Sequence, residues 1–549
     1  MIITANPEIA SPDTAFSTGA NAAHTDSGKT RRDSPVRISL LRSATGLVLL
    51  AICIADVYQF ADPDIWGHIR FGQLVLSTHH AILHDTFSYT AFGREFRNHE
   101  WLTDVTMAFI YNHAGILGLK IWKFLFVAGT ILAVVVAMAE TGASIAVQLI
   151  VLLTAASALP LQEQFRPLVY TLFFFAATIA LLVRHNYRGS APLYLMVPTM
   201  LLWSNVHGGF VVGLGAIGIY AAAASLEDML CGRGMKRAWT LAFYTLAATL
   251  VTLANPFGIG NWRTVLDFVF SPYIRNVIGD WRPLIPALLD QLHSNAPMGA
   301  LLYILVIVVI GFVVLTFCLT PRGGDLPLVA IAAAMSYAAF NARRNIPLAA
   351  IACSPVLARH ASLCFERLRA RNLVGPPLYS TNPAGLQRIQ RLTGVFAILI
   401  AIAAGIFSPR LQDDRGYPIG AVAFMKAHRL HGNILNDFDW GDYLIWHEPE
   451  SKVFIDGRFA AVYPFSVIRE YLDFYIDHWN TTEALSSYRS DFVLISPSRK
   501  AYDLMMSLPD WRLIYSDRDS ALFAKSNSAA AKLTDVPVVG HMPAKSYFP

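Results

Sequence analysis

Long apolar runs recur along most of the chain, and their length is the first structural signal. A run such as LLYILVIVVIGFVVLTFCLT continues for about 20 residues, the length that an α-helix needs to cross a hydrocarbon core of roughly 30 Å. We therefore predict about eleven membrane spans, of which those near 191–226 and 326–358 are short enough that a re-entrant hairpin is the alternative. The expected spans are 38–59, 116–138, 143–160, 167–184, 191–204, 209–226, 238–254, 298–319, 326–341, 345–358 and 392–408.

The pattern changes after residue 408. The segments KVFID, DFVLIS, WRLIYS and ALFAK are typical of short strands, and the last two are joined by DRDS, a hairpin composition. VIREYLDFYIDHW and SRKAYDLMMSL are typical of helices. We predict a mainly α-helical polytopic membrane protein, whose membrane domain at 37–408 has a long first outer loop at 60–115, followed by a C-terminal extramembrane α/β domain at 409–525. Residues 1–36 and 526–549 are predicted to be disordered tails.

Composition and charge support this interpretation and give an orientation. Of the 549 residues 54% are hydrophobic and 15% are charged, whereas a soluble domain carries about 25% charged residues. Basic clusters at 29–37, 184–189, 231–237 and 359–391 fall on one side of the predicted spans, and this side is expected to be cytoplasmic. The first loop and the C-terminal domain then lie outside. The net charge of +5 carries no stripe typical of nucleic-acid binding, and none of the five cysteines lies in a long outer segment.

The first outer loop begins with the densest group of charges, DPDIWGHIR at residues 62–70. Acids next to a span are costly unless they have a function, so Asp62 and Asp64 are candidate catalytic residues. They could share a divalent cation such as Mg²⁺ or Mn²⁺, or one acid could act as a base. The alternative is that they cap a helix. His68 and Arg70, which capping does not require, are candidate substrate-binding residues.

Other polar residues are expected on the same outer side. In RNHEWLTD, His99 and Glu100 could lie on an amphipathic helix at the membrane surface, with Glu100 as a catalytic candidate. His207 in SNVHGGF is a substrate-binding candidate, or simply a packed histidine where glycines allow close helix approach. Four further candidates stand at span ends, where arginine pairs can bind phosphate or extend to lipid headgroups. They are Glu163, Arg166, Arg343 and Arg344.

The outer domain has its own candidate stretch at residues 436–458. Trp440, Asp442 and Tyr443 place aromatic rings beside a carboxylate, a combination that suits sugar or peptide recognition. The alternative is ordinary turn chemistry at a strand–helix junction. Because the domain starts within about ten residues of the last span, we expect this stretch near the first loop, above Asp64.

This layout resembles the GT-C glycosyltransferases, and distantly the catalytic subunit of oligosaccharyltransferase. The family pattern Asp-Pro-Trp-Phe-Asn-Tyr-Arg is similar to Asp64–Arg70, and its Trp-Trp-Asp-Tyr-Gly signature is similar to Asp439–Tyr443. Proline follows Asp62 and not Asp64, and Gly441 and Leu444 depart from the signature. The set DPDIWGH, FSYT, NHEW, NVHGG, NPFG, RRNIP and WGDYLIW is more similar to a bacterial branch of GT-C-like proteins.

The resemblance implies a multi-pass transferase of the bacterial inner membrane, with its N-terminus in the cytoplasm and its C-terminal domain in the periplasm. It would move a sugar from a polyprenyl-phosphate carrier to a hydroxyl of a glycan or lipid acceptor. Asp64 would act as the base, and Arg343 and Arg344 would hold the phosphate. Membrane lipid is the other expected partner. Two alternatives remain open, namely a lipid-linked glycan transporter and a non-catalytic assembly factor whose outer domain binds glycan or protein.

Overall fold

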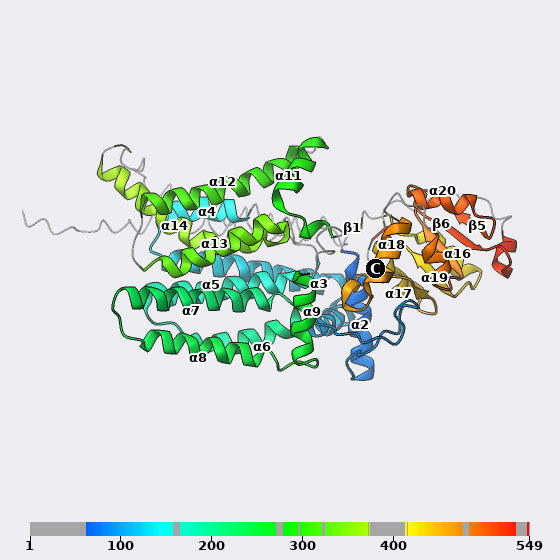
Figure 1. Ribbon diagram of the computed structural model, residues 1–549, viewed down its shortest axis with the longest axis horizontal. Coiled ribbons are helices and arrows are strands. Elements are labelled where there is room, and N and C mark those ends of the chain that lie inside the picture. Colours follow the sequence, from blue (N-terminus) through cyan, green and yellow to red (C-terminus); the bar gives the residue numbers. More distant parts are fainter. Residues whose placement is uncertain are drawn as a thin grey trace, which may run out of the picture.

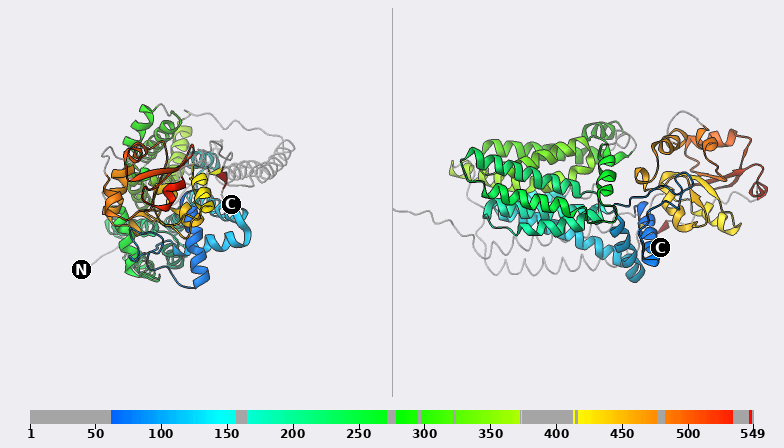
Figure 2. Two further views of the ribbon diagram at one scale, coloured as in Figure 1. Left: turned by 90° about the vertical axis from the view of Figure 1, so that its right-hand side faces the viewer. Right: turned by 60° about the horizontal axis from the view of Figure 1, so that its bottom comes forward.

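The chain forms a helical bundle and a smaller α/β part, and helix α2 (Asp64–Thr78) lies between them (Figures 1 and 2). The computed structural model describes residues 62–156, 165–270, 278–294, 297–320, 324–371, 373, 412–413, 416–475, 482–533 and 546–547. All statements below concern these residues.

The bundle helices run side by side, and α9 crosses their end next to the α/β part (Figure 1). The core of the bundle is built where α3 packs on α5 and where α13 packs on α7 and α14. The bounds are α3 (Trp101–Glu140), α4 (Ile145–Ala156), α5 (Leu168–Arg188), α6 (Met196–Val206), α7 (Phe210–Leu230), α8 (Lys236–Val251), α9 (Ile259–Phe270), α11 (Leu284–His293), α12 (Pro297–Leu319), α13 (Leu326–Asn341) and α14 (Ile346–Ala370), with short 3₁₀ turns η2 (Leu193–Leu195), η3 (Gly279–Trp281) and η4 (Arg343–Asn345).

Five helices, α3, α5, α7, α12 and α14, are long and apolar enough to cross a membrane. Shorter apolar helices cover Ala146–Ala155, Leu193–Val206 and Leu326–Asn341. The mainly helical, multi-pass character is therefore confirmed. The predicted spans at 38–59 and 392–408, and the end of the span at 143–160, lie outside the described residues, so the total of about eleven stays a prediction.

Two helices extend beyond their predicted spans. Helix α3 begins at Trp101 and not near 116, and it kinks at Gly115, whose φ of 55° is not helical. Helix α14 does not end near 358 but continues to Ala370. The apolar pattern of the sequence stops near residue 358, where the predicted span ends. Arg359 Nε lies 3.1 Å from Asp325 Oδ1, and this ion pair fixes the additional turns of α14 to the start of α13.

The α/β part contains a five-stranded mixed sheet of order β3–β2–β4–β6–β5. Strand β2 is parallel to β3 and β4, whereas β6 is antiparallel to β4 and β5. The four predicted strands and the DRDS hairpin form; β2 was missed because only two apolar residues stand between its asparagines. The bounds are β2 (Asn433–Asn436), β3 (Lys452–Val453), β4 (Phe492–Ile495), β5 (Trp511–Ser516), β6 (Ala521–Lys525), α16 (Ile419–Ala427), α17 (Gly441–His447), α18 (Phe465–Tyr475), α19 (Glu483–Ser487) and α20 (Lys500–Ser507), with 3₁₀ turns η5 (Phe438–Trp440), η6 (Phe459–Ala461) and η7 (Ala529–Leu533).

The segment after residue 525 is not wholly the disordered tail that the sequence suggests. Residues Ala529–Leu533 form η7, in which Ala530 and Ala531 are buried. Further on, β7 (Ser546–Tyr547) pairs with β1 (Gln412–Asp413). Small alanines allow this close packing, which composition alone does not indicate.

The first loop joins the two parts. Ser88 pairs with Val453 of β3, and Val453 N–H donates to Phe87 O at 3.1 Å, so the loop covers an edge strand that would otherwise be open. On α2, the buried Trp66 ring contacts Tyr443 and Trp446 of α17 at centroid distances of 5.4 and 5.7 Å. The sheet domain is thereby held directly over the end of the bundle.

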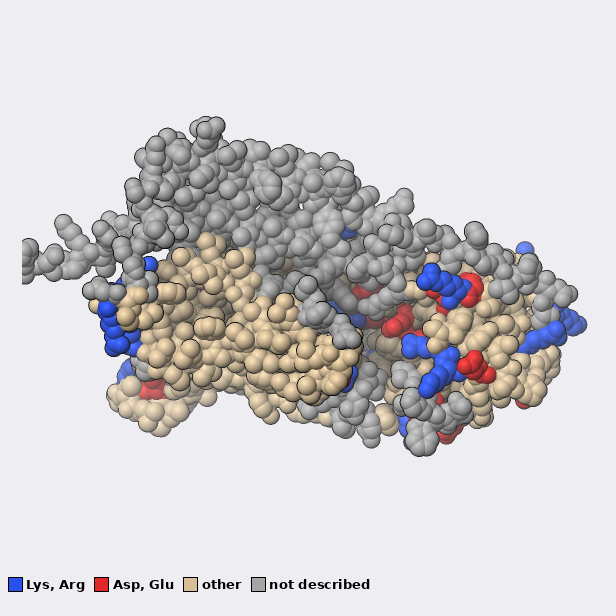
Figure 3. Space-filling view, turned by 90° about the horizontal axis from the view of Figure 1, so that it is seen from above, with Lys and Arg blue, Asp and Glu red and all other residues tan. Residues whose placement is uncertain are grey.

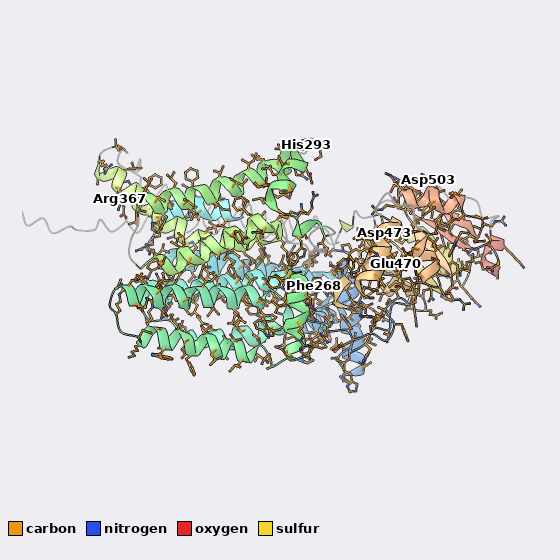
Figure 4. All side chains as sticks on the ribbon, in the orientation of Figure 1. Phe268, His293, Arg367, Glu470, Asp473 and Asp503 are labelled. Carbon is orange, nitrogen blue, oxygen red and sulfur yellow. The ribbon has the colours of Figure 1, made fainter. Side chains whose placement is uncertain are left out.

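Charged residues avoid the surface of the bundle. In Figure 3 they gather on the α/β part and at the opposite end of the bundle, with an uncharged expanse between them. Figure 4 shows Arg367 at the far end, while Asp473 and Asp503 lie in the α/β part. An uncharged band of this kind is what a surface facing lipid requires.

Candidate active site

Helix α2 presents Asp64 and His68 on one face, because residues four apart in a helix are neighbours. Its first turn is fixed by Asp62, whose Oδ1 accepts a hydrogen bond from Asp64 N–H at 3.0 Å. Asp62 is fully buried, whereas Asp64 faces a cavity. The capping interpretation therefore accounts for Asp62 and leaves Asp64 as the acid that can meet a ligand.

Arg166, just before α5, joins the acids of two separate segments. Its Nε lies 2.5 Å from Asp62 Oδ2, its Nη1 3.4 Å from Asp280 Oδ2 and its Nη2 3.7 Å from Asp64 Oδ2. Asp280 in turn pairs with Arg343 at 3.1 Å. Arg166 is therefore an internal counterion as well as a lining residue, a role that its position near a span end did not reveal.

His68 is held by a carboxylate on its other side. Its Nδ1 lies 2.6 Å from Asp104 Oδ1, and Asn98 Nδ2 donates to Asp104 Oδ2 at 2.7 Å. Burial alone would lower the pKa of His68, but the charges of Asp104 and the hydrogen bond to it outweigh burial and raise this pKa to about 10. His68 is thus an imidazolium close to Asp64.

Two histidines face Glu100 across the cavity wall. His99 Nε2 and His207 Nε2 lie 3.8 and 3.5 Å from Glu100 Oε1. Although burial opposes ionisation, the neighbouring His99 and His207 keep the pKa of Glu100 below its usual value. Contrary to the prediction, His99 and Glu100 do not lie on an amphipathic helix. They precede α3, which begins at Trp101.

The HGG motif is explained by close packing around His207. Its Nδ1 lies 2.6 Å from Thr171 Oγ1 and accepts a hydrogen bond from Gly209 N–H at 3.0 Å, so the ring proton of the neutral form is on Nε2. A Cβ at Gly208 would lie 3.1 Å from the His99 ring. Burial lowers the pKa of His207 to about 4. The packed-histidine alternative is therefore correct, and the same residue also lines the cavity.

The two arginines of RRN have different surroundings. Arg343 donates to Tyr303 Oη at 2.9 Å and to Asp280 at 3.1 Å. The Arg344 guanidinium lies 4.3 Å above the Trp281 ring and lines the cavity, and no carboxylate among the described residues is within ion-pair distance of it. The expected arginine pair is thus split into one structural cation and one that faces the open space.

The outer domain contributes Asp442 to the same cavity. A Cβ at Gly457 would lie 2.6 Å from Asp64 Oδ1 and closer still to Asp442 Oδ2, so both carboxylates border one glycine-sized gap. Gly457 N–H donates to Asp442 Oδ2 at 3.0 Å, while Asp442 Oδ1 is buried without a partner among the described residues. The predicted closeness of this stretch to Asp64 is confirmed.

Trp440 and Tyr443, expected to touch substrate, occupy packing positions instead. The Trp440 indole is buried and donates to Gly416 O at 3.1 Å. The Tyr443 ring stacks on Tyr417 at 4.7 Å and meets Trp66 edge-on. The helix α17 that starts here turns both rings toward the domain core and α2, and only Asp442 toward the cavity.

A cavity of about 460 Å³ lies between α2, the outer domain and the ends of the bundle helices that face this domain. Phe268, near the centre of Figure 4, is one of its lining residues. The sequence-predicted site residues that line it are Asp64, His68, His99, Glu100, Arg166, His207, Arg344 and Asp442. The predicted residues Asp62, Arg70, Arg343, Trp440 and Tyr443 do not line it, and Glu163 lies outside the described residues.

The position of Arg70 has a simple reason. It follows His68 by two residues, so it points to another side of α2.

Sequence reasoning missed Asp280 and Arg458, which both line the cavity. Arg458 Nη1 lies 2.6 Å from Asp85 Oδ1 and Nη2 lies 2.6 Å from Asp456 Oδ2, and this joins the outer domain to the first loop. Arg458 lies in the stretch DGR and Asp280 in the stretch GDW, but Asp85 and Arg166, with which they pair, are distant in sequence.

The two carboxyl groups that border the gap at Gly457, those of Asp64 and Asp442, have raised pKa values. Burial, and next the carboxylate of Asp62, raise the pKa of Asp64 to about 7. Burial and the neighbouring Asp456 and Asp64 raise the pKa of Asp442 well above its usual range. A carboxyl group with a pKa near neutrality is suited to accept and release a proton.

The predicted divalent metal does not fit Asp62 and Asp64. Asp62 Oδ2 is in a 2.5 Å ion pair with Arg166, and its Oδ1 already accepts the α2 N–H, so neither oxygen is oriented to a metal shared with Asp64. Among the described residues, no group of three or more His, Cys, Asp or Glu side chains is arranged to hold a metal ion. We therefore derive no step through a metal.

No known protein family matches the sequence, and no curated protein does. Solved structures match in fold. The archaeal oligosaccharyltransferase AglB of Archaeoglobus fulgidus, in complex with an inhibitory peptide and a dolichol-phosphate, has a TM-score of 0.50 at 14% identity over 83% of this chain and 69% of its own. The same enzyme, tethered with an acceptor peptide, gives a TM-score of 0.51 at 13% identity with equal coverage.

The chain has a GT-C-like fold. This confirms the resemblance that its motifs indicate. ArnT of Cupriavidus metallidurans bound to undecaprenyl phosphate matches over 91% of this chain and 99% of its own at 12% identity, with a TM-score of 0.48. At these identities the likeness concerns the fold, and the activity has to be argued from the cavity.

Proposed function

We propose that this GT-C-like protein is a membrane glycosyltransferase that moves a sugar from a polyprenyl-phosphate-linked donor to a hydroxyl group of a glycan or lipid acceptor. The observation that carries this proposal is that Asp64 and Arg344 line one cavity of about 460 Å³. The reaction needs a base for the acceptor and a cation for the leaving phosphate. The similar AglB structure contains a dolichol-phosphate, which supports a polyprenyl carrier.

Arg344 is the group best placed to receive the phosphate. Its guanidinium rests on the Trp281 ring and keeps its N–H donors free of carboxylates among the described residues, so a phosphate can accept from them through two parallel hydrogen bonds. The cavity floor beside it is apolar, with Val212, Val265 and Met335, which suits the first carbons of a lipid chain. Arg343, held by Asp280 and Tyr303, supports the turn that presents Arg344.

Asp64 would act on the acceptor. The acceptor oxygen attacks the anomeric carbon and gives its proton to the Asp64 carboxylate, while the bond from this carbon to the carrier phosphate breaks and its electron pair leaves with the phosphate. General base catalysis of this kind contributes roughly 10²–10⁴-fold. His68, an imidazolium on the same helix face, stabilises negative charge near Asp64. Glu100 and its two histidines form the opposite wall, where they can bind sugar hydroxyls.

The acceptor would enter beneath the outer domain. Asp442, Phe438 and Phe459 line this side of the cavity and provide a carboxyl group and two rings, groups that suit hydroxyls and apolar sugar faces. The tight packing of Trp440 and Tyr443 leaves recognition to these three residues. A site beneath the outer domain also limits the access of water, because an activated sugar must react with its acceptor before water hydrolyses it.

We place the protein in the bacterial inner membrane, with the N-terminus in the cytoplasm and the outer domain in the periplasm. The uncharged band of Figure 3 and the basic Arg367 at the far end of the bundle in Figure 4 support this orientation. Topology reporters fused after residues 30 and 415 should give opposite signals if about eleven spans precede the outer domain. Equal signals would contradict the orientation.

The donor site is tested with undecaprenyl phosphate as the probe. Native mass spectrometry of the full-length protein should detect one bound lipid phosphate, and Arg344→Met should weaken this binding about tenfold. Arg282→Met is the matched control, because Arg282 is largely exposed and pairs with Asp290 at 2.6 Å outside the cavity. Equal binding by both variants would remove Arg344 from the donor site.

Catalysis is distinguished from its alternatives by Asp64→Asn. A transporter or a non-catalytic assembly factor would keep its function in this variant, because shape and hydrogen-bonding capacity are retained. A transferase would lose turnover while still binding undecaprenyl phosphate.

A further inference from the structure

The outer acids are grouped around a guanidinium. Arg166 directs three nitrogens to three carboxylates: Nε to Asp62 at 2.5 Å, Nη1 to Asp280 at 3.4 Å and Nη2 to Asp64 at 3.7 Å. The planar fork of arginine fixes these directions, which a lysine ammonium cannot reproduce. The guanidinium therefore stands where the DPD motif suggested a divalent cation.

The charges around Arg166 explain why a metal is not needed there. Asp62 and Asp280 lie closest to guanidinium groups, since Arg343 approaches Asp280 at 3.1 Å as well. Asp64 has the longest of the Arg166 contacts, at 3.7 Å, and keeps its second oxygen at the Gly457 gap. A divalent ion beside Asp62 would meet the positive charge of Arg166 at short range, which is strongly unfavourable away from bulk water.

We propose that Arg166 is the resident cation of this site, and that the protein binds no divalent metal between Asp62 and Asp64. The guanidinium holds Asp62 in place at the start of α2 and orients the Asp64 carboxylate, so that its free oxygen faces the acceptor. This inference rests on the proposed function only for its catalytic consequence. Its statement about cation binding stands on the ion pairs alone.

Mn²⁺ is the probe for the binding test, which uses the full-length protein in detergent after chelator treatment. Electron paramagnetic resonance should show no stoichiometric Mn²⁺ bound to the wild type. Arg166→Met keeps an unbranched apolar stem but leaves Asp62, Asp64 and Asp280 without their common counterion. We expect this variant to gain one Mn²⁺ site, because acidic oxygens in a group bind hard divalent cations.

Two matched variants show whether the gained site is the expected one. Arg343→Met also removes a guanidinium from Asp280, but leaves Arg166 with Asp62, so it should gain no Mn²⁺. Adding Asp62→Asn to Arg166→Met should abolish the gain. A folded Arg166→Met protein that binds no Mn²⁺ would contradict the proposal that the guanidinium occupies a cation position.

Mn²⁺ binding to the wild-type protein tests the proposal even if Arg166→Met does not fold. One tightly bound Mn²⁺ in the wild type that is lost in Asp62→Asn would overturn the proposal. Transfer should also persist in excess chelator within about twofold, and a loss that Mn²⁺ restores would overturn it as well. If the wild type transfers no sugar at all, the proposed function fails, and the Mn²⁺ titration still tests the role of Arg166.

Discussion

The two ends of the helical bundle both carry arginine–aspartate clusters, but they differ in what these clusters leave open. At the far end, Asp325 accepts from Tyr187 Oη at 2.7 Å and pairs with Arg359 at 3.1 Å. At the end under the outer domain, Asp64 has one distant ion pair, and Asp442 Oδ1 has no partner among the described residues. The acid of the far-end cluster is paired within the cluster, whereas the acids under the outer domain border a cavity.

This difference teaches how to separate a structural ion-pair network from a site. Both clusters bury carboxylates, so burial and charge alone do not distinguish them. The outer cluster combines buried acids with an adjoining cavity of about 460 Å³ and with a lining arginine that stacks on an aromatic ring without a carboxylate partner among the described residues. Mutations at the two ends should accordingly affect different properties of the protein, namely turnover at one end and stability at the other.

The largest effect is expected for Asp64→Asn. Turnover should fall by about 10²–10⁴-fold, because the amide cannot accept the acceptor's proton. Thermal unfolding should stay near that of the wild type, since the one ion pair of Asp64 with another described residue is the 3.7 Å contact with Arg166. Release of undecaprenyl phosphate from a lipid-linked sugar fraction measures turnover without knowledge of the acceptor. A variant that keeps full turnover would move the role of base to Glu100.

At the far end, Asp325→Asn should do the reverse. Removing the charge takes the carboxylate partner from Arg359, which is mostly buried in the middle of α14, at a cost of about 3 kcal/mol in the free energy of unfolding. The turnover of the molecules that remain folded should be unchanged. Arg184→Met is the control, because Arg184 is half-exposed where it pairs with Glu140, and such pairs contribute less than about 1 kcal/mol. A loss of turnover without a loss of stability would contradict the comparison.

The pH dependence sharpens the difference further. Because burial and Asp62 raise the pKa of Asp64 to about 7, the base is protonated and inactive at lower pH. The rate should therefore rise about tenfold per pH unit up to about 7 and then level off. His68, with a pKa of about 10, remains charged over this range and adds no second step near neutrality. A rate that is flat from pH about 5 to 8 would exclude Asp64 as the titrating base.

The smallest effects are expected within α17. Burial and the neighbouring carboxylates raise the pKa of Asp442 and so favour its neutral form, which Asn resembles, so Asp442→Asn should reduce turnover by less than about tenfold. Tyr443→Phe should change it by less than about twofold, because this ring packs against Tyr417 outside the cavity. A larger effect of Tyr443→Phe would restore it as a substrate-binding residue.

Local patterns predicted most elements and part of the site. Uninterrupted apolar runs identified α5, α7 and α12, and short apolar segments between turn signals identified β4, β5 and β6. Spacing along a single segment indicated Asp64 and His68, because a helix brings residues four apart together. The short distance between the last predicted span and the start of the outer domain led to the expectation that Asp442 lies near the first loop, where the structure has it.

Contacts between segments that are distant in sequence could not be predicted from local patterns. Arg166 and Asp62 are brought together because α3 packs against both α5 and α2, and no local spacing encodes this pairing. Trp440 and Tyr443 were misjudged for the same reason. Aromatic rings beside acids suit both a sugar site and a domain core, and only the direction of α17 decides between them. The proposed absence of a metal likewise depends on a guanidinium near Asp62 that comes from another part of the chain.

The central claim is that Asp64 acts as the base of a transferase that uses a lipid-linked sugar. The most direct test measures polyprenyl-phosphate-linked sugars by mass spectrometry in lipid extracts of a deletion strain that carries the wild type, Asp64→Asn or Asp503→Asn. Asp503 is an exposed acid of α20 in the outer domain, well away from the cavity (Figure 4). We predict that one lipid-linked sugar accumulates in the deletion strain and with Asp64→Asn, and that the wild type and Asp503→Asn remove it. Removal by Asp64→Asn at the wild-type level would contradict the account.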